Sequence, residues 1–131
     1  MCIFCKIVNH EIPCHQILED GQTLAFLDIK PVNPGHTIIL PKKHYKNIEE
    51  IGEVDLKALI LVIKKVGGLL KDRLGVAGYN VNCNNDPLAG QTIPHLHFHV
   101  IPRRFGDGCV AWPQGAYGAG EAEEIIKKLI D

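Results

Sequence analysis

The sequence predicts an α+β fold: a mostly antiparallel sheet of five strands, one long helix and a second helix at the C-terminus. Two observations support this prediction. Short apolar segments bounded by turn residues come before and after a single long stretch with helical periodicity. The resulting order, strands, helix, strands, helix, is typical of α+β proteins with antiparallel sheets. Because the 131 residues contain no internal repeat or linker, we expect a single domain over residues 1–131.

Three strands are predicted in the first third of the chain. Residues 15–19 and 23–27 flank Asp20-Gly21, a dipeptide that favours a tight hairpin turn. Residues 30–35, rich in proline, asparagine and glycine, predict a loop. Residues 36–40 then predict a third strand, which should end at Pro41 because proline has no backbone N–H to donate.

The long helix is predicted at residues 53–73. Its apolar residues recur at three- and four-residue steps, which places them on one face: Leu56, Leu59, Ile60, Ile63, Val66 and Leu70. Gly67-Gly68 should weaken this helix by roughly 1 kcal/mol per glycine relative to alanine. Gly75 is expected to end the helix. Strands at 79–83 and 95–101 and a terminal helix at 121–130 complete the predicted fold.

Composition argues against several classes of function. The formal net charge is −1, so there is no basic excess to favour a nucleic-acid partner. No apolar stretch approaches the ~20 residues needed to cross a bilayer, and no signal-peptide pattern is visible, so no membrane partner is expected. The five cysteines are odd in number and form no disulfide-like framework. This cysteine usage favours a reducing, cytoplasmic location.

Residues 93–102, IPHLHFHVIP, contain the most informative pattern of the chain. Three of its seven histidines, His95, His97 and His99, occupy alternate positions. In a strand they would project from one face, with neighbouring Cα atoms ~6.6 Å apart, while the apolar residues between them face a helix. Such a row indicates either a metal site of three imidazoles or phosphoryl transfer. In the second case one imidazole attacks and its neighbours donate protons near their ordinary pKa of ~6.5.

A polar loop comes directly before the histidine row. Residues 83–92, CNNDPLAGQT, include side-chain amides, a hydroxyl and glycine backbone that suit phosphate oxygens: Asn84, Asn85, Gly90, Gln91 and Thr92. The loop is not a Walker loop, because no Gly-Lys-Ser/Thr follows. Its position next to the histidines favours phosphate binding over a plain polar turn.

The segment HLHFHVI at 95–101 matches the signature of the histidine triad family. Two further blocks resemble that family in the expected order: CIFCKI at 2–7 and LAFLDIKPVNPGHTIILPKKH at 24–44. The polar loop and the histidine row together form a third block at 83–102. The chain is therefore similar to histidine triad proteins over most of its length. The helix at 53–73 and the residues after Arg103 match less closely.

The resemblance implies a nucleotide hydrolase or transferase that forms a homodimer with a continuous antiparallel sheet across the interface. His97 would attack the α-phosphate of a purine nucleotide and form a nucleotidyl-histidine intermediate, which water then hydrolyses. His99 would contact the phosphate and the scissile bridging atom, and His36 would order the row from a buried position. The implied substrates are nucleoside phosphoramidates or related AMP conjugates. Dinucleoside polyphosphate hydrolysis, or nucleotide binding with vestigial activity, is the alternative.

Further positions match nucleotide-binding residues of the family. Asp28 matches the acid that binds the ribose, and Ile29 matches a residue lining the base pocket. The phosphate loop is matched at Asn84, Gly90 and Thr92, with Gln91 between them. Without the family context, Asp28 would suit a turn before Lys30-Pro31 equally well.

The N-terminal Cys2-Ile3-Phe4-Cys5 has the spacing of half a zinc site, the alternative being a redox pair. A closed tetrahedral site needs two more ligands. A zinc-bearing branch of the histidine triad family uses two cysteines and two histidines, which match Cys2, Cys5, His44 and His95. The resemblance thus implies a structural zinc ion and leaves His97 and His99 for chemistry.

The segment after the triad, residues 103–120, is rich in glycine and contains the only tryptophan, Trp112. It is longer before this tryptophan than in the compact purine-nucleotide phosphoramidases that the family includes. By resemblance, Trp112 would either border the active site of the second subunit or anchor the tail, and the sequence favours neither.

Overall fold

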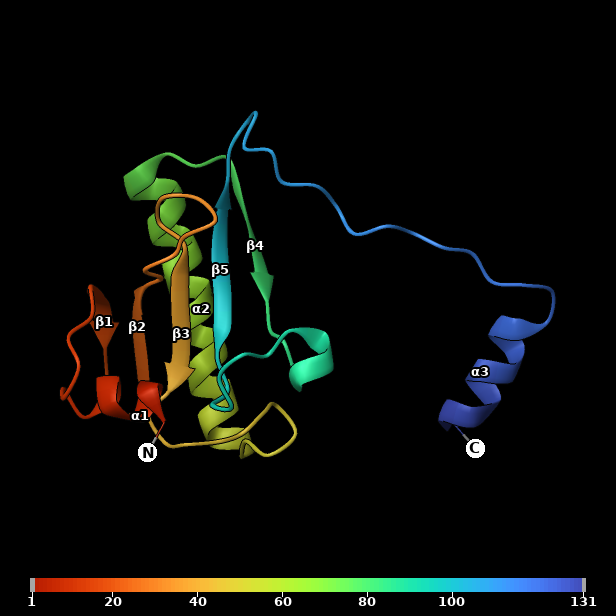
Figure 1. Ribbon diagram of the computed structural model, residues 1–131, viewed down its shortest axis with the longest axis horizontal. Helices are drawn as coiled ribbons and strands as arrows, with labels where there is room; N and C mark the ends of the chain where they lie inside the picture. The colour runs from red at the N-terminus through yellow and green to blue at the C-terminus, as the bar shows by residue number, and fades with distance from the viewer. Residues whose placement is uncertain (1, 131) are drawn as a thin grey trace.

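The computed structural model describes residues 2–130 and confirms the predicted α+β fold. One sheet contains β1 (Gln16–Glu19), β2 (Thr23–Leu27), β3 (Thr37–Pro41), β4 (Gly78–Asn82) and β5 (Phe98–Arg103). Its strand order is β1-β2-β3-β5-β4, and every neighbouring pair is antiparallel. Because β5 lies between β3 and β4 (Figure 1), His99 is placed inside the sheet, opposite Ile38 of β3 and Asn82 of β4.

The helical segments of residues 2–130 are α1 (Ile3–Val8), α2 (Glu53–Leu74), the 3₁₀ turn η1 (Pro87–Ala89) and α3 (Glu121–Ile130). The prediction of α2 is confirmed, and it ends as expected at Gly75, whose φ is 66° and whose N–H bonds to the carbonyl of Lys71. The short α1 was not predicted. Six residues are too few to show a helical period, and its N-cap is Cys2, an unusual capping residue whose Sγ accepts from the N–H of Cys5.

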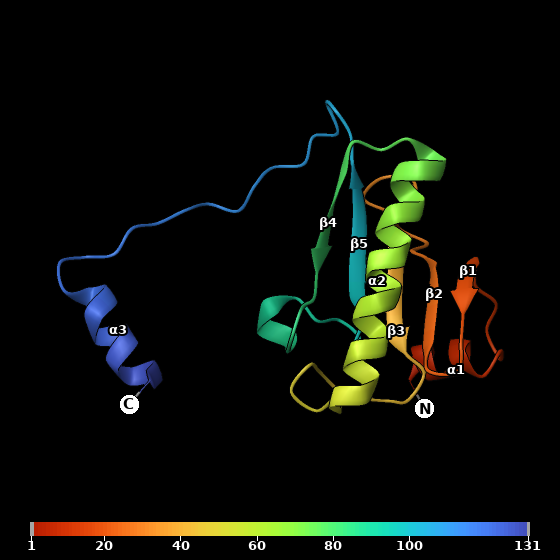
Figure 2. The same cartoon turned by 180° about the vertical axis from the view of Figure 1, so that it is seen from behind.

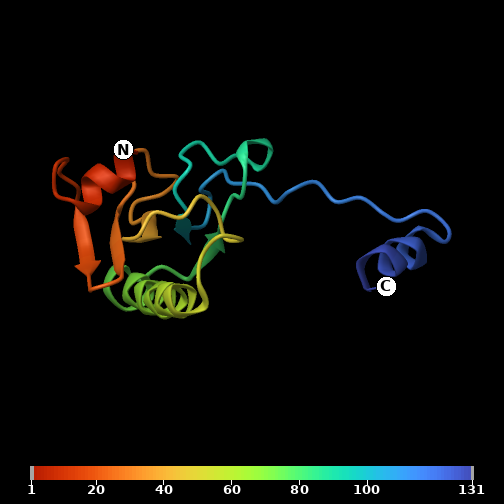
Figure 3. The ribbon, with the colours of Figure 1, turned by 90° about the horizontal axis from the view of Figure 1, so that it is seen from below.

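The helices α1 and α2 lie on opposite faces of the sheet (Figure 3). On the α2 face, a buried cluster joins the helix to the sheet. The helix contributes Leu59, Val62, Ile63, Val66 and Leu70, and the strands and the segment before β5 contribute Ala25, Ile39, Leu96, Phe98 and Val100. Ile60 was expected in this stripe, but it is 48% exposed. Val62 is buried instead, so the face of α2 that meets the sheet is turned away from Ile60 and toward Val62. On the other face, Phe4 and Ile7 of α1 pack with Leu24, Phe26 and Ile38.

Gly67 allows α2 to approach β4 closely. A Cβ at this position would overlap the ring of Tyr79 on β4. At the neighbouring Gly68, a Cβ would meet no atom within 4 Å. Two glycines were predicted to weaken the helix. Packing against the sheet explains the glycine at position 67, on the side of α2 that crosses the sheet (Figure 2), and does not explain Gly68.

The last strand is shorter than predicted. We expected a strand from His95 to Ile101, but β5 begins at Phe98. Extending the β3–β5 register would place Leu96 opposite Pro41, which has no N–H to donate. The carbonyl of Pro41 instead accepts from Nε2 of His95, and the N–H of Leu96 donates to Tyr45. The same strand ends at Arg103, two residues later than predicted, and the ends of the other four strands lie within one residue of the prediction.

The chain after β5 leaves the body as an extended segment that leads to α3 (Figure 1). The start of this segment is fixed: the carboxylate of Asp107 accepts hydrogen bonds from Arg103, Asn33 and the N–H of Cys109. None of the described residues of α3 is buried. Over residues 2–130, no helix has the length and apolar character needed to cross a membrane.

Candidate active site and metal centre

A pocket of about 460 Å³ opens on the sheet face opposite α2. It brings together predicted site residues from three separate segments: Asp28, Ile29, Gly90, Thr92, His97 and His99. Its wall is apolar and comes mainly from α1, β2, β3 and the residue after the polar loop: Ile3, Phe4, Ile7, Phe26, Ile38 and Ile93. The pocket therefore has an apolar half and a polar half that meet at the histidines.

Three predicted phosphate-loop residues, Asn84, Asn85 and Gln91, are not among the residues lining this pocket. The Oδ1 of Asn85 accepts from the N–H of Ile48 at 2.8 Å. Asn84 lies next to the pocket, and its Nδ2 donates to the carbonyl of Gly90 at 3.4 Å. Gln91 is buried: its Nε2 donates to the carbonyl of Lys46 at 2.7 Å, and its Oε1 accepts from the N–H of Asp86 at 2.8 Å. These bonds make Gln91 a residue that shapes the loop.

The ring of His97 is buried and has a defined tautomer. Its Nδ1 lies 2.8 Å from the carbonyl oxygen of His95. Because a carbonyl can only accept, Nδ1 must carry the proton, which leaves a lone pair on Nε2. Burial lowers the pKa of His97 from its ordinary value. The ring is therefore a neutral imidazole with a nucleophilic nitrogen.

A chain of hydrogen bonds gives His99 the opposite tautomer. The N–H of Val32 donates to Nδ1 of His36 at 3.0 Å, so the proton of His36 is on Nε2. That Nε2 lies 2.8 Å from Nδ1 of His99 and 3.6 Å from Oδ2 of Asp28. Since Nδ1 of His99 accepts, its Nε2 carries the proton. Burial, with a smaller contribution from His97 and His36, lowers the pKa of His99 to about 4.

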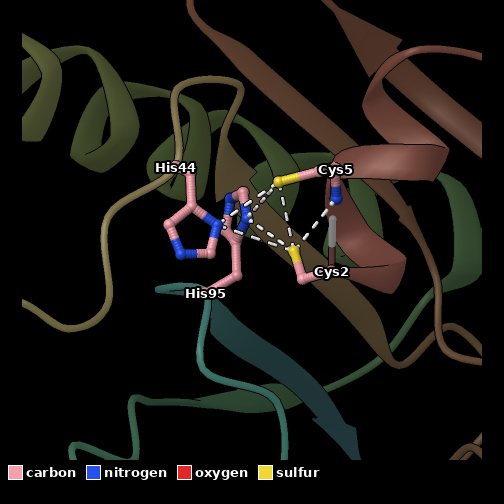
Figure 4. A group of neighbouring side chains, drawn as sticks. All are labelled: Cys2, Cys5, His44 and His95. Carbon is pink, nitrogen blue, oxygen red and sulfur yellow. Dashed lines mark hydrogen bonds between the residues drawn. The ribbon is translucent and has the colours of Figure 1, made fainter.

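The four predicted metal ligands lie close together at the His95 end of the histidine row (Figure 4). The two sulfur atoms of Cys2 and Cys5 are 3.1 Å apart. Nδ1 of His44 lies 3.6 Å and 3.3 Å from these sulfurs, and Nδ1 of His95 lies 3.4 Å and 3.6 Å from them. All four donor atoms lie within 4.8 Å of one another. The structure thus joins residues that are far apart in the sequence.

This donor set fits a zinc ion. A tetrahedral zinc site has Zn–S distances of ~2.3 Å and Zn–N distances of ~2.0–2.1 Å, so its donors must surround a common centre as these do. Nε2 of His95 donates to the carbonyl of Pro41 at 2.9 Å, which leaves the lone pair on the Nδ1 that faces the cysteines. Among residues 2–130, His95, His97 and His99 do not form a metal-binding group together. A metal site of all three triad histidines is therefore contradicted.

Phe4 connects the two ends of the histidine row. Its ring contacts that of His97 edge-on at 4.9 Å between centroids, and that of His95 at 5.9 Å. Phe4 lies between Cys2 and Cys5, so the segment that carries two of the candidate metal ligands also packs against His97. Sequence reasoning missed this contact and the N–H of Val32, because neither the helix nor a backbone donor shows in the residue pattern.

Comparison with known proteins identifies the family. A model of the HIT domain matches residues 9–106. The chain belongs to the HIT, or histidine triad, family. It is 46% identical over 129 residues to an uncharacterized HIT-like protein of Methanocaldococcus jannaschii, with 98% of each chain covered. It is 38% identical over 135 residues to an adenosine 5'-monophosphoramidase of Schizosaccharomyces pombe, again with 98% of each covered.

Solved structures agree with this assignment. A HIT family protein of Bacillus subtilis superposes with a TM-score of 0.90 at 34% identity, over 98% of this chain and 94% of its own. A zinc-bound histidine triad family protein of Mycobacterium smegmatis superposes with a TM-score of 0.77 at 34% identity, over 82% of this chain and 78% of its own. The HIT fold of this chain is thus shown, and a relative with that fold binds zinc.

Proposed function

We propose that this HIT protein hydrolyses AMP-type nucleoside phosphoramidates through a nucleotidyl-histidine intermediate on His97. One observation carries the proposal: hydrogen bonds at Nδ1 hold His97 and His99 in opposite tautomers. His97 has a free lone pair on Nε2, as a nucleophile needs, and His99 has a proton on Nε2, as a leaving group needs. Relatives named adenosine 5'-monophosphoramidases, 38% identical to this chain, support the reaction class.

The proposed reaction has two steps. First, Nε2 of His97 attacks the α-phosphorus and the P–N bond breaks, its electron pair leaving with nitrogen. The departing amine takes the Nε2 proton of His99, and one proton from solution restores that nitrogen. Second, water attacks phosphorus, the bond to His97 breaks, and one proton is released. The sum is phosphoramidate plus water to AMP plus amine, and splitting it in two avoids direct attack of water on a crowded anion.

The remaining pocket residues suit the other parts of an AMP group. The carboxylate of Asp28, oriented by the N–H of Lys30 at 2.8 Å, can accept hydrogen bonds from ribose hydroxyls. Ile29, 83% exposed at the pocket edge, and the apolar wall suit a purine base. Gly90, Thr92 and Asn84 can donate to phosphate oxygens. Gln91 supports that loop from behind.

Zinc held by Cys2, Cys5, His44 and His95 would be structural, because a closed four-ligand site has no open position for substrate. The residues themselves fasten α1 to the segment that precedes β5. The predicted homodimer belongs to the same proposal.

The alternative of a nucleotide-binding protein with vestigial activity does not account for the two tautomers. Binding alone needs no nucleophilic nitrogen beside a proton donor. Dinucleoside polyphosphate hydrolysis uses the same nucleophile and differs only in the leaving group, so the chemistry of the leaving group must separate these two reactions.

The test is release of AMP from adenosine 5'-phosphoramidate by the wild-type protein and by His97→Ala. Loss of a nucleophile costs roughly 10⁴-fold or more in rate, and His97→Ala should lose that much. His10→Ala, which removes an exposed histidine outside the pocket, is the matched control and should keep full activity. Equal rates for wild type and His97→Ala would contradict the proposal. Tight AMP binding without release by wild type would favour the binding protein.

A further inference from the structure

The polar loop before the histidine row has a strained backbone conformation at Asp86. Its φ of 73° and ψ of 156° fall in a region that only glycine adopts readily. Pro87 also keeps this ψ extended, because a proline ring disfavours the α region for the residue before it. Among residues 2–130, His10 is the one other non-glycine residue with a positive φ, and it lies outside the pocket. The surrounding structure must therefore hold Asp86 in place.

The side chain of Asp86 does not cap the turn that it begins. Asp86 is the N-cap of η1, where an aspartate usually accepts from N–H groups of the first turn, but no such hydrogen bond forms here. Its Oδ1 accepts instead from Nδ2 of Asn47, 3.2 Å away and 39 residues earlier in the chain. Its N–H donates to Oε1 of Gln91 at 2.8 Å. Two side-chain amides thus hold the strained residue.

Asn47 is itself oriented by the backbone around it. It is 8% exposed, and its Oδ1 accepts from the N–H groups of Glu49 and Glu50 at 3.1 Å and 3.3 Å. Because a backbone N–H can only donate, these bonds fix which end of the amide is the oxygen. They direct Nδ2 toward the carboxylate of Asp86, so the donor is in place before the bond forms.

The segment around Asn47 supports the same loop at two further points. The carbonyl of Lys46 accepts from Nε2 of Gln91 at 2.7 Å, and the N–H of Ile48 donates to Oδ1 of Asn85 at 2.8 Å. Three successive residues therefore bond to the polar loop. Asn47 differs from its two neighbours because its side chain is the group that meets the strained residue.

The conformation of Asp86 affects where the phosphate-binding end of the loop lies. Gly90 and Thr92 follow Asp86 in the loop and line the nucleotide pocket. The carbonyl of Asp86 accepts from the N–H of Gln91, between these two residues, at 3.2 Å. A change at Asp86 would therefore move both of them. Donors that are held in place before a ligand arrives cost less to order on binding.

We propose that Asn47 is a positioning residue for phosphate binding. It holds Asp86 in its strained conformation and thereby keeps Gly90 and Thr92 in place for the α-phosphate. Asn47 acts through the loop, since it is not among the residues that line the pocket. The proposal rests on the proposed function and adds a residue outside the pocket on which its phosphate contacts depend. Loss of Asn47 should weaken the binding of a phosphate and spare the binding of a nucleoside.

The first test compares AMP with adenosine, which lacks the phosphate, by calorimetry. The dissociation constant of adenosine divided by that of AMP reports how much affinity the phosphate adds. Asn47→Ala should lower this ratio about 10-fold, the loss expected for one hydrogen bond to a charged group. The affinity for adenosine should stay as in wild type, because the pocket wall is untouched. An unchanged ratio in Asn47→Ala would overturn the inference.

Asn33→Ala is the matched control for a general loss of stability. Asn33 is also 8% exposed and also donates to a carboxylate, that of Asp107 at 3.1 Å, but it makes no contact with the polar loop that would hold Asp86. This variant should keep the wild-type ratio. A fall as large as that in Asn47→Ala would mean that any buried asparagine has this effect, and the positioning role would be wrong.

The second test separates the strain at Asp86 from its side-chain contact. Asp86→Ala and Asp86→Gly both remove the carboxylate, but only glycine adopts a φ of 73° without strain. Asp86→Ala should therefore lower the ratio about 10-fold, as Asn47→Ala does, whereas Asp86→Gly should keep it. Adding Asn47→Ala to Asp86→Gly should cause no further fall. Equal losses in the two Asp86 variants would overturn the inference.

Release of AMP from the phosphoramidate separates this inference from the proposed reaction. If wild type hydrolyses the phosphoramidate and Asn47→Ala keeps the ratio, the reaction stands and the role of Asn47 fails. If wild type binds AMP without turnover and the ratio falls as expected, the reaction fails and the role of Asn47 in phosphate binding stands.

Discussion

The two faces of the central sheet take alternate residues of the same segment, yet they depend on different physics. Between residues 95 and 100, the even-numbered side chains are apolar and pack against α2. The odd-numbered histidines meet carbonyls, a backbone N–H relay and cysteines. Shape and volume specify the first face, whereas the hydrogen-bond partner of each ring nitrogen specifies the second. A shift of register by one residue would exchange core and site, so the core also enforces the chemistry.

The largest expected effect tests the histidine face through its metal group. Cys5→Ser should lose about one bound zinc per chain and on the order of several kcal/mol of stability, because structural zinc binding is coupled to folding. Elemental analysis and thermal unfolding with and without a chelator measure both. Cys14→Ser changes a pocket-wall cysteine outside the group and should retain metal. Wild-type protein prepared with zinc that binds none would refute this prediction.

An intermediate effect tests the α2 face. Gly67→Ala should destabilise the protein by about 1–3 kcal/mol, because the new methyl group meets Tyr79. Gly68→Ala should instead stabilise it by roughly 0.5–1 kcal/mol, because that position is open and alanine favours a helix. Urea unfolding measures both, and both should bind AMP as wild type does. If the two variants lost equal stability, close packing at Gly67 would not be the cause.

The smallest effect concerns pH. The pKa of His99 is about 4 in the fold, against ~6.5 in an unfolded chain. Between these values the unfolded chain binds more protons, so the stability from neutral His99 is complete above pH ~6.5 and is lost as pH falls toward 4. His36, whose pKa burial also lowers, adds to this despite the opposing charge of Asp28.

For His99 alone, the loss between pH 7.5 and pH 6 should be less than about 1 kcal/mol. Urea unfolding across this range should show a shallower slope for His99→Gln than for wild type. Identical slopes would mean that the histidine face does not titrate with folding, and the contrast between the two faces would be weaker.

The sequence revealed the apolar face more fully than the histidine face. Period-two and helical patterns predicted the five strands and α2, because those patterns record which side chains are buried. The alternation of residues 95–99 singled out His97 and His99, and the family match added Asp28 and the separate roles of the two histidines. Neither supplied the Val32 donor, since a backbone N–H belongs to every residue except proline.

The metal group has a further consequence for how the chain reaches its fold. Its ligands lie 39 residues apart from Cys5 to His44 and 93 apart from Cys2 to His95. With zinc bound as proposed, the ion would act as a cross-link that closes these long loops. A chelator would remove this cross-link, whereas a thiol reductant would leave it intact. During synthesis this link could close only after residue 95 had left the ribosome. The last ligand, His95, is also the first histidine of the triad, so the zinc site and the strand that carries the reactive histidines would be completed almost together.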